Sequence, residues 1–396
     1  MDIEIRTVSE HIYDDVTKLL GRSYGNRDDH YFRQQHSGDP SYSHDRAWVL
    51  LEDGKMVSHV LAYDKVMRYG AGRIRFGAIG DVATDPEHRR RGHAAKLLEN
   101  AVDYMKRNDL PLSLLYTGTQ SLYEGAGWHV VPATVLEADV PAEARPGPRA
   151  YTVKPFEESQ LRLLASYWDQ AMSNLVGPLD RSVEYFQRQP SWLRVRGDIE
   201  WDVIHRVGHP AGFVRTCVNG ETLELLDVCG TSDEVIQVAC AWAVRRAVES
   251  GCRKIEGRVA PGSILVRELA AFADIRLTTS DSQMMRLNDL EGVLRGALPE
   301  FHRRRRHNPL ADQPVTLAVG DSAVRLEFPS GTVALGTPED GDGTLELTDK
   351  QFLHMLMGLP GAQEPIAESS LRPSVKSQLS NIFPETGHVF WDADAF

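Results

Sequence analysis

The stretch from Asp81 to Leu98 reads DVATDPEHRRRGHAAKLL, and it decides how the first part of the chain folds. The residues over 74–84 predict a strand, and the run from about 92 to 106 has the apolar spacing of a helix. Pro86 and a basic loop separate the two. Because a helix N-terminus carries unpaired N–H groups and partial positive charge, this strand–loop–helix order predicts an anion-binding turn.

The motif Arg89-x-x-Gly92-x-Ala94 fills the predicted turn. Gly92 leaves room for a diphosphate to approach the backbone, and Ala94 keeps the next turn open. Arg90 and Arg91 add cationic side chains. The spacing differs from that of the P-loop and of the dinucleotide-binding Gly-x-Gly-x-x-Gly loop. A plain helix start after a basic loop is the structural alternative.

A second motif, LYEGAGW over 122–128, follows the first about thirty residues later in the chain. Together the two resemble the acetyl-coenzyme A site of the GNAT superfamily of N-acetyltransferases. There the first loop cradles the pyrophosphate, and a Tyr placed as Tyr123 is here stands beside the thioester sulfur. The structural alternative for Tyr123 is a packed ring whose hydroxyl bonds to backbone.

The order of predicted elements divides the chain into three parts. Strands and helices alternate up to about residue 140, with Ser9 expected to cap the first helix, and PAEARPGPRA over 141–150 marks a boundary. The next part repeats the same element order. From residue 288 a short helix over 290–298, a basic run, short strands, a helix over 349–357 and an irregular tail are expected.

This layout resembles the Eis (enhanced intracellular survival) acetyltransferases. The resemblance implies an α+β or α/β fold in which tandem GNAT folds, with mixed central sheets flanked by helices, precede a sterol-carrier-protein-like α+β domain. The predicted domains are a catalytic domain at 1–140, a degenerate second GNAT-like domain at 150–287, and a sterol-carrier-like domain at 288–396. Only the first contains Arg-x-x-Gly-x-Ala, so only the first is expected to bind the cofactor.

The resemblance also implies which residues hold acetyl-CoA. Backbone groups of the strand residues would meet the pantetheine and the acetyl carbonyl, the loop would hold the pyrophosphate, and two residues after the next strand would flank the pantetheine arm. His88 and His93 are read as surface residues at the helix start. The full expected set is Val82, Ala83, Thr84, Arg89, Arg90, Arg91, Gly92, His93, Ala94, Ala95, Gly118 and Thr119.

The last residues, WDADAF, carry the next implication. In Eis enzymes a terminal Phe turns back into the cleft and its α-carboxylate serves as the base, which gives that role to Phe396. Asp81 competes for it, because acidic residues near this strand act as base in other GNAT enzymes. Asp394 and Asp28 are expected to receive a cationic amine; a solvated loop is the alternative for Asp28. An aromatic-rich ending argues against a frayed tail.

Composition excludes several classes of protein. The chain of 396 residues, with 42% hydrophobic and 25% charged residues, suits two or three soluble globular domains. A net charge of −12 argues against duplex nucleic acid or an anionic membrane as the main partner. No stretch is apolar enough to span a bilayer, and no leader pattern opens the chain. We therefore expect a cytoplasmic location.

Cysteine and arginine placement narrows the chemistry. The four cysteines begin at Cys217 and show no compact metal-binding spacing, so no metal is expected. A covalent acetyl-cysteine route would need a thiol in the first domain, and none lies there. The arginine run over 303–306 is expected to be a solvated face or a contact between subunits.

These observations predict direct acetyl transfer in a ternary complex. The resemblance to the Eis family implies that the acceptor is a primary amine of a cationic molecule (an aminoglycoside, a polyamine or a lysine-like amine), with the Phe396 carboxylate as base and Tyr123 as acid. Backbone N–H groups near 82–84 would stabilise the oxyanion. The family resemblance implies a homo-hexamer. The alternative is a non-catalytic acyl-CoA or lipid-binding protein with a vestigial transferase site.

Overall fold

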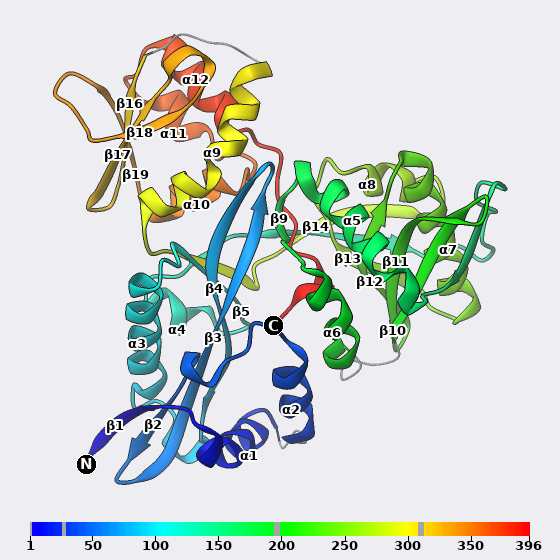
Figure 1. The fold of residues 1–396 in the computed structure, drawn as a ribbon, viewed down its shortest axis with the longest axis horizontal. Coiled ribbons are helices and arrows are strands. Elements are labelled where there is room, and N and C mark those ends of the chain that lie inside the picture. The colour runs from blue at the N-terminus through cyan, green and yellow to red at the C-terminus, as the bar shows by residue number, and fades with distance from the viewer. Residues whose placement is uncertain (1, 26–28, 194–198, 308–312) are drawn as a thin grey trace.

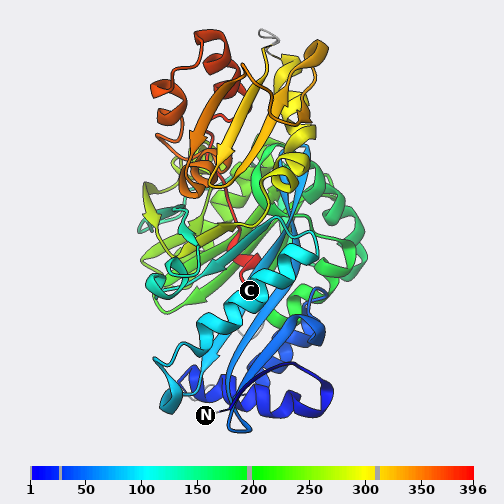
Figure 2. The same cartoon turned by 90° about the vertical axis from the view of Figure 1, so that its left-hand side faces the viewer.

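The computed structural model describes residues 2–25, 29–193, 199–307 and 313–396. Three sheets occupy three regions of the molecule, and helices cover their faces (Figure 1). The last segment of the chain runs from the third sheet down between the first two and ends near the middle of the molecule (Figures 1 and 2).

The first sheet is mixed and has the strand order β1-β2-β3-β4-β5-β15-β6, with β9 added beside β3. Its strands are β1 (Ile3–Thr7), β2 (Ala47–Glu52), β3 (Lys55–Tyr69), β4 (Gly72–Thr84), β5 (Leu112–Tyr116), β6 (His129–Val130), β9 (Val176–Leu179) and β15 (Gln283–Leu287). The predicted strand over 74–84 is confirmed as the greater part of β4.

Two irregularities in β4 shape the middle of this sheet. A β-bulge between His59 and Leu61 of β3 sets Asp81 and Val82 of β4 against a single β3 residue, and Asp81 has φ +50°. On its other edge β4 pairs in parallel with β5 only over 76–78. Beyond Ala78 the two strands diverge, which leaves one edge of β4 without a strand partner over 79–84.

Helices on both faces cover the first sheet. α1 (Tyr13–Ser23) and α2 (Asp29–Gly38) lie on one face, and α3 (His93–Arg107) lies on the other (Figure 1). The short α4 (Gln120–Glu124) follows β5. Ser9 is extended ahead of the first helical turn, but its side chain makes no cap hydrogen bond, so the expected cap is wrong.

The second sheet has the order β14-β7-β13-β12-β11-β10-β8. Its strands are β7 (Ala133–Asp139), β8 (Tyr151–Pro155), β10 (Ile199–Arg206), β11 (His209–Asn219), β12 (Thr222–Gly230), β13 (Lys254–Arg258) and β14 (Asp274–Ser280). Its helices are α5 (Leu161–Ala171), α6 (Val183–Leu193), α7 (Asp233–Glu249) and α8 (Ile264–Leu269).

The two large sheets repeat one topology and exchange a strand. In each, four antiparallel strands lead into one parallel pair, β4–β5 or β12–β13, and two antiparallel strands follow. The sixth place of the first sheet is taken by β15, and that of the second sheet by β7. Sheet membership therefore crosses the division expected near residues 140–150, and the domain limits remain a prediction.

The third sheet has the order β18-β17-β16-β19. Its strands are β16 (Val315–Val319), β17 (Ser322–Glu327), β18 (Ala334–Gly336) and β19 (Gly343–Leu347). The helices of this part are α9 (Leu290–His307), α10 (Asp349–Leu356), α11 (Glu364–Glu368) and α12 (Pro373–Ile382).

Two sequence expectations about this part are wrong. The expected short helix continues through the arginine run to His307. Arg303 and Arg304, one helical turn after Glu300, form ion pairs with its carboxylate and stabilise this extension. Arg305 is buried and donates to the Phe328 carbonyl, so most of the run is used inside the chain. The expected irregular tail contains α11 and α12 and ends in a short 3-10 helix, η8 (Asp392–Asp394).

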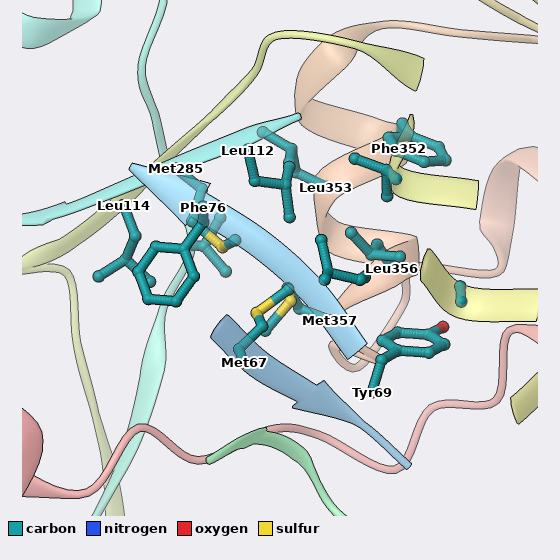
Figure 3. Close-up of a cluster of buried hydrophobic side chains, with 14 of the residues drawn as sticks. Met67, Tyr69, Phe76, Leu112, Leu114, Met285, Phe352, Leu353, Leu356 and Met357 are labelled. Atoms are coloured by element: carbon teal, nitrogen blue, oxygen red, sulfur yellow. The ribbon is translucent and has the colours of Figure 1, made fainter. Parts of the chain in front are cut away.

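One apolar core joins the first sheet to the last part of the chain. Met67, Phe76 and Leu112 of the sheet belong to the same buried cluster as Leu353 and Leu356 of α10 (Figure 3). Burying this much apolar side chain holds the two parts together, since each such group contributes about 1.5–3 kcal/mol. Among the described residues, no helix is both long enough and apolar enough to cross a membrane.

Candidate active site

The predicted anion-binding turn forms at the start of α3. Gly92 is the N-cap, with φ +80°, and a Cβ there would meet nothing within 4 Å. The helix bonds begin with Lys96 N–H donating to the Gly92 carbonyl, so the N–H groups of His93, Ala94 and Ala95 precede the first turn. Arg90 is exposed beside them and has φ +63°.

The two outer arginines of the motif also hold the loop in place. Arg89 donates to the carbonyls of Thr84 at 3.3 Å and Ser23 at 3.0 Å, and thereby joins β4 to the end of α1. Arg91 pairs with the buried Glu52 carboxylate at 2.9 Å. These contacts give both side chains a structural role, and their predicted contact with the cofactor remains a prediction.

His93 is not the surface residue expected from the sequence. It is buried beneath the turn, 3.8 Å from the Glu52 carboxylate, and His88 lies half-buried at 3.5 Å from the same group. Burial lowers the pKa of His93, so the ring stays neutral near pH 7. The buried ring does not reach an anion, so His93 can contribute to an anion site only through its backbone N–H.

The free edge of β4 lies next to this turn. The carbonyl groups of its last residues already accept side-chain hydrogen bonds: Val82 from the Tyr24 hydroxyl at 3.1 Å and Ala83 from Ser58 at 2.8 Å. Across the gap between β4 and β5, Gly118 and Thr119 are exposed between β5 and α4, where Thr119 N–H donates to the Thr117 hydroxyl at 2.8 Å.

Tyr123 lies on α4 at the same gap. Its side chain is 8% exposed, and its ring meets Trp128 edge-on with centroids 6.3 Å apart. Burial, partly offset by a hydrogen bond with Thr117, raises the pKa of Tyr123 to about 12. The phenol therefore keeps its proton at neutral pH and can serve as a proton donor.

The C-terminal segment is anchored into the middle of the molecule. Val389 N–H donates to the Val176 carbonyl of β9 at 3.0 Å, and Asp392 pairs with Arg258 at 3.2 Å. Asp394 accepts from Arg181 at 2.8 Å. This segment contacts β12 and the end of β13, so the place in the second sheet that corresponds to the β4–β5 gap is covered by the chain itself.

Phe396 ends this segment on the first sheet. Its ring lies among Tyr63, Phe76 and Tyr116, with centroid distances of 6.3, 6.5 and 5.4 Å. Its carboxyl carbon is 3.9 Å from the position that a Cβ would take at Gly80. Because Gly80 has no side chain and immediately precedes Asp81, the terminal carboxyl group fits against β4 where the strand begins to diverge.

Asp394, expected from the sequence to receive the amine, has partners within the chain. Its carboxylate is buried and accepts hydrogen bonds from Arg181 and Tyr185, and Arg181 also pairs with Asp227 at 2.6 Å. Its negative charge therefore faces an arginine of the same chain. We assign Asp394 an anchoring role, and its contact with substrate remains a prediction. Asp28 lies outside the described residues.

Asp81 is held by residues that the sequence did not single out. Its carboxylate lies 2.6 Å from His36 Nε2, and His36 Nδ1 lies 2.9 Å from the Tyr13 hydroxyl. His59 Nδ1 lies 2.8 Å from the Asp81 carbonyl. Burial lowers the pKa of His59 to about 4, so a neutral imidazole donates this bond and holds the bulge.

Aromatic rings and one buried ion pair complete the surroundings. Lys65 and Asp39 pair at 2.7 Å with side chains 3% and 5% exposed, and the Lys65 ammonium lies 5.2 Å from the ring centres of both Tyr63 and Tyr185. For His36, Asp39 and Tyr42 the sequence signal was the accumulation of His, Tyr and Asp over 30–44. Nothing in that pattern indicated which of them face β4.

Two cavities lie near these elements. One of about 280 Å³ adjoins the Phe396 surroundings and is bordered by Lys65 and Tyr185. A larger one, of about 530 Å³, lies on the second sheet, bordered by Phe156, Trp201 and Arg215, apart from the candidate site. Phe396, Gly80 and Asp81 do not border either of these cavities, so neither is assigned to an acceptor.

Comparison with known proteins agrees with this site. Residues 4–131 match the family described as the acetyltransferase (GNAT) domain. These residues include the anion-binding turn, the free edge of β4 and Tyr123. The match identifies residues 4–131 as a GNAT acetyltransferase domain.

Solved structures resemble the chain over its whole length. A GCN5-related N-acetyltransferase from Anabaena variabilis is 17% identical, covers 100% of both chains and has a TM-score of 0.78. One from Kribbella flavida is 18% identical, with 100% and 98% coverage and a TM-score of 0.75. Eis1 from Mycobacterium abscessus is 15% identical, covers 100% of both chains and has a TM-score of 0.70. Among curated proteins none matches. The chain therefore has the complete fold of an Eis-like GNAT N-acetyltransferase.

Proposed function

We propose that this protein transfers the acetyl group of acetyl-CoA to a primary amine of a cationic acceptor. The expected acceptors are an aminoglycoside, a polyamine or a lysine-like amine. The observation that carries the proposal is the terminal carboxyl group of Phe396, which lies against Gly80 beside the free edge of β4. A base at this place can act on an amine that approaches the edge where an acetyl group would be held.

The chain offers groups that fit acetyl-CoA. The first-turn N–H groups of α3, the open position at Gly92 and the exposed Arg90 form an anion site for a diphosphate. The diverging strands β4 and β5 leave backbone groups for the pantetheine arm. In the second sheet the equivalent divergence is covered by the C-terminal segment, which supports a single cofactor site.

Acetyl-CoA supplies an acetyl thioester whose C–S bond breaks as the new C–N bond forms. The Phe396 carboxylate accepts the proton that the acceptor ammonium must lose before it can attack. A backbone N–H between Val82 and Thr84 stabilises the negative charge on the carbonyl oxygen. The Tyr123 hydroxyl donates its proton to the departing sulfur.

The cysteines support direct transfer over an acetyl-enzyme. All four are buried, and none lies in residues 1–216. Burial raises the pKa of Cys229, Cys240 and Cys252, which keeps these thiols protonated and unreactive. Initial-rate kinetics should therefore show intersecting, not parallel, double-reciprocal lines.

The same proposal includes the assembly and the remaining part of the chain. By family resemblance we expect a homo-hexamer in the cytoplasm, with a sterol-carrier-like third domain and no metal requirement. Sedimentation of the purified protein tests the hexamer directly, because a monomer has a mass of 44.2 kDa.

Thiol release tests the proposed activity. Acetyl-CoA is incubated with the full chain and kanamycin, spermidine or a lysine-containing peptide, and free CoA thiol is measured with and without each amine. The proposal requires amine-dependent release with at least one acceptor. Acetyl-CoA binding without release on any amine would contradict it and would favour the alternative, a non-catalytic acyl-CoA or lipid-binding protein.

A further inference from the structure

The bulge in β4 turns two consecutive residues to one face of the sheet. A Cβ at Gly80 would meet Tyr63 at 3.1 Å and the Phe396 carboxyl carbon at 3.9 Å. In a regular strand Asp81 would point to the opposite face. Instead its carboxylate reaches His36 of α2, on the face where Tyr63 and Phe396 pack.

The flanking residues confirm that this change of direction is local. Ile79 and Val82 pack with the side chains of α3 on the other face. The φ of +50° at Asp81 is uncommon for a residue with a side chain, although Asp tolerates it better than most. Because strained backbone residues cluster at functional sites, the strain at Asp81 indicates that the direction of its side chain serves a function.

A chain of hydrogen bonds fixes that orientation. An ionised carboxylate only accepts, so His36 Nε2–H donates to Asp81 at 2.6 Å. In a neutral imidazole Nδ1 then accepts from the Tyr13 hydroxyl at 2.9 Å. The His36 ring is stacked on Tyr42 with centroids 4.4 Å apart, which leaves it little freedom to rotate.

The carboxylate is the end of this chain that reaches solvent. The side chain of Asp81 is 9% exposed and that of His36 is 1% exposed. Beside it, the buried Tyr63 hydroxyl has no hydrogen-bond partner among the described residues. An unpaired buried hydroxyl is costly, and its position between Tyr42 and Phe396 indicates that a ligand supplies the missing bond.

Asp81 and the chain terminus thus place two carboxyl groups on the same face of the sheet, where Tyr63 also lies. Like charges in one site disfavour each other unless a cation lies between them. The nearby Lys65 ammonium is already paired with Asp39, so it does not fill this place. A primary ammonium group has the charge and the donors that both carboxylates and Tyr63 require.

We propose that Tyr13 and His36 are positioning residues that keep the Asp81 carboxylate turned toward the acceptor, so that Asp81 binds its ammonium group while the terminal carboxylate removes the proton. This inference rests on the proposed function and assigns the two carboxylates different roles. It makes the acceptor an aliphatic primary amine, since the hydroxyl of Tyr63 and both carboxylates can each accept one of its three N–H bonds.

Variants at His36 test the proposal. His36→Leu removes the donor to Asp81, whereas His36→Gln retains an N–H that can replace it. We expect His36→Leu to raise the KM for spermidine about tenfold, with kcat and the KM for acetyl-CoA changed less than about twofold. His36→Gln should recover most of the affinity, and Tyr13→Phe should cause a smaller loss than His36→Leu.

A double-mutant cycle and a matched control separate positioning from folding. Because His36 acts through Asp81, His36→Leu should cause no further loss in an Asp81→Asn background. His44→Leu serves as control, because among the described residues His44 contacts Tyr13 and Tyr42 but makes no hydrogen bond to Asp81. Additive losses, or equal losses from His36→Leu and His36→Gln, would overturn the proposal.

Calorimetry distinguishes the failure of this inference from that of the proposed function. Spermidine binding to the full chain is measured without acetyl-CoA in the wild type and in His36→Leu. Wild-type acetylation with undiminished spermidine binding by His36→Leu refutes the positioning role alone. Binding that depends on His36 without acetylation of any amine refutes the proposed function alone.

Discussion

At the residue scale, the proposed mechanism uses one phenol with a raised pKa. The pKa of Tyr123 is about 12 because the side chain is buried, so its proton remains in place far above neutral pH. A hydroxyl that is always protonated needs no partner to serve as acid. Burial also raises the pKa of Tyr63, but Tyr63 lies on β3 whereas Tyr123 lies on α4, which follows β5.

Tyr123→Phe tests this assignment. The change removes the proton donor but keeps the ring against Trp128, so we expect kcat to fall about 100-fold with the KM for acetyl-CoA nearly unchanged. In the wild type, the rate should show no alkaline loss from Tyr123 until the pH approaches 12. Wild-type kcat in Tyr123→Phe would remove Tyr123 from the mechanism.

The residues of the loop and of Tyr123 could be predicted because their motifs are contiguous in the sequence. His36, Tyr13 and Tyr63 could not, because each comes from a different element and only the bulge at Asp81 brings them together. A bulge leaves no periodic signal in the sequence. The buried places of His93 and Arg305 were missed for a related reason: their partners Glu52 and Phe328 are distant in the chain.

At the element scale, the junction of β4 and α3 creates the anion site. The left-handed conformation of Gly92 turns the chain so that the first N–H groups of α3 face outward. An L-residue in this conformation is strained by about 1 kcal/mol. Its Cβ would also occupy the space next to those N–H groups.

Gly92→Ala and Gly208→Ala form a matched pair. Both glycines have φ +80° and open space around the Cβ position, but Gly208 lies in a turn between β10 and β11. Each change should lower the free energy of unfolding by about 1 kcal/mol. Only Gly92→Ala should raise the KM for acetyl-CoA, by about tenfold. Equal cofactor kinetics in the two variants would show that the turn does not contact the diphosphate.

The order of elements was predicted well, whereas the exchange of β7 and β15 between the sheets was not. Each strand has ordinary local alternation, and nothing in it indicates which sheet it joins. The arginine run over 303–306 was expected to be a solvated face or a contact between subunits, because only its composition was considered. The pairing of Arg303 and Arg304 with the buried Glu300 depends on helix continuation past the expected end.

At the scale of the whole molecule, a buried charge network fixes the C-terminal segment. Arg181 joins Asp394 to Asp227, which also pairs with Arg215. Although burial alone would raise it, the pKa of Asp227 is lowered by the two arginines. The terminal carboxylate thus depends on side chains from the second sheet and α6.

Asp394→Asn should release this segment. It removes one charge from a buried network, so we expect the free energy of unfolding to fall by about 3 kcal/mol and thiol release to fall with it. Glu184→Gln is the control, because Glu184 on α6 forms an exposed pair with Arg188 that contributes under about 1 kcal/mol. Thermal unfolding of the two variants measures the difference; equal stability would contradict the anchoring role.

Two buried histidines make stability depend on pH. Burial lowers the pKa of both His59 and His388 to about 4, whereas an unfolded histidine titrates near 6.5. Between these values the unfolded chain binds more protons, so stability falls as the pH drops from 6.5 toward 4, by roughly 3 kcal/mol for each histidine. Urea unfolding across this range should show the slope, and His59→Gln should reduce it. Replacement of the exposed His209 should leave it unchanged.

We propose that the terminal carboxylate beside Gly80 acts as the base of an amine acetyltransferase. The most direct test is to append one glycine after Phe396, which keeps the ring but moves the carboxylate. Phe396→Leu is the counterpart, since it keeps the carboxylate and shortens the side chain. If the Phe396 carboxylate is the base, the extension should lower kcat at least about 100-fold without changing acetyl-CoA binding. Phe396→Leu should remain active. Full activity of the extended chain, with activity lost instead in Asp81→Asn, would show that the Phe396 carboxylate is not the base.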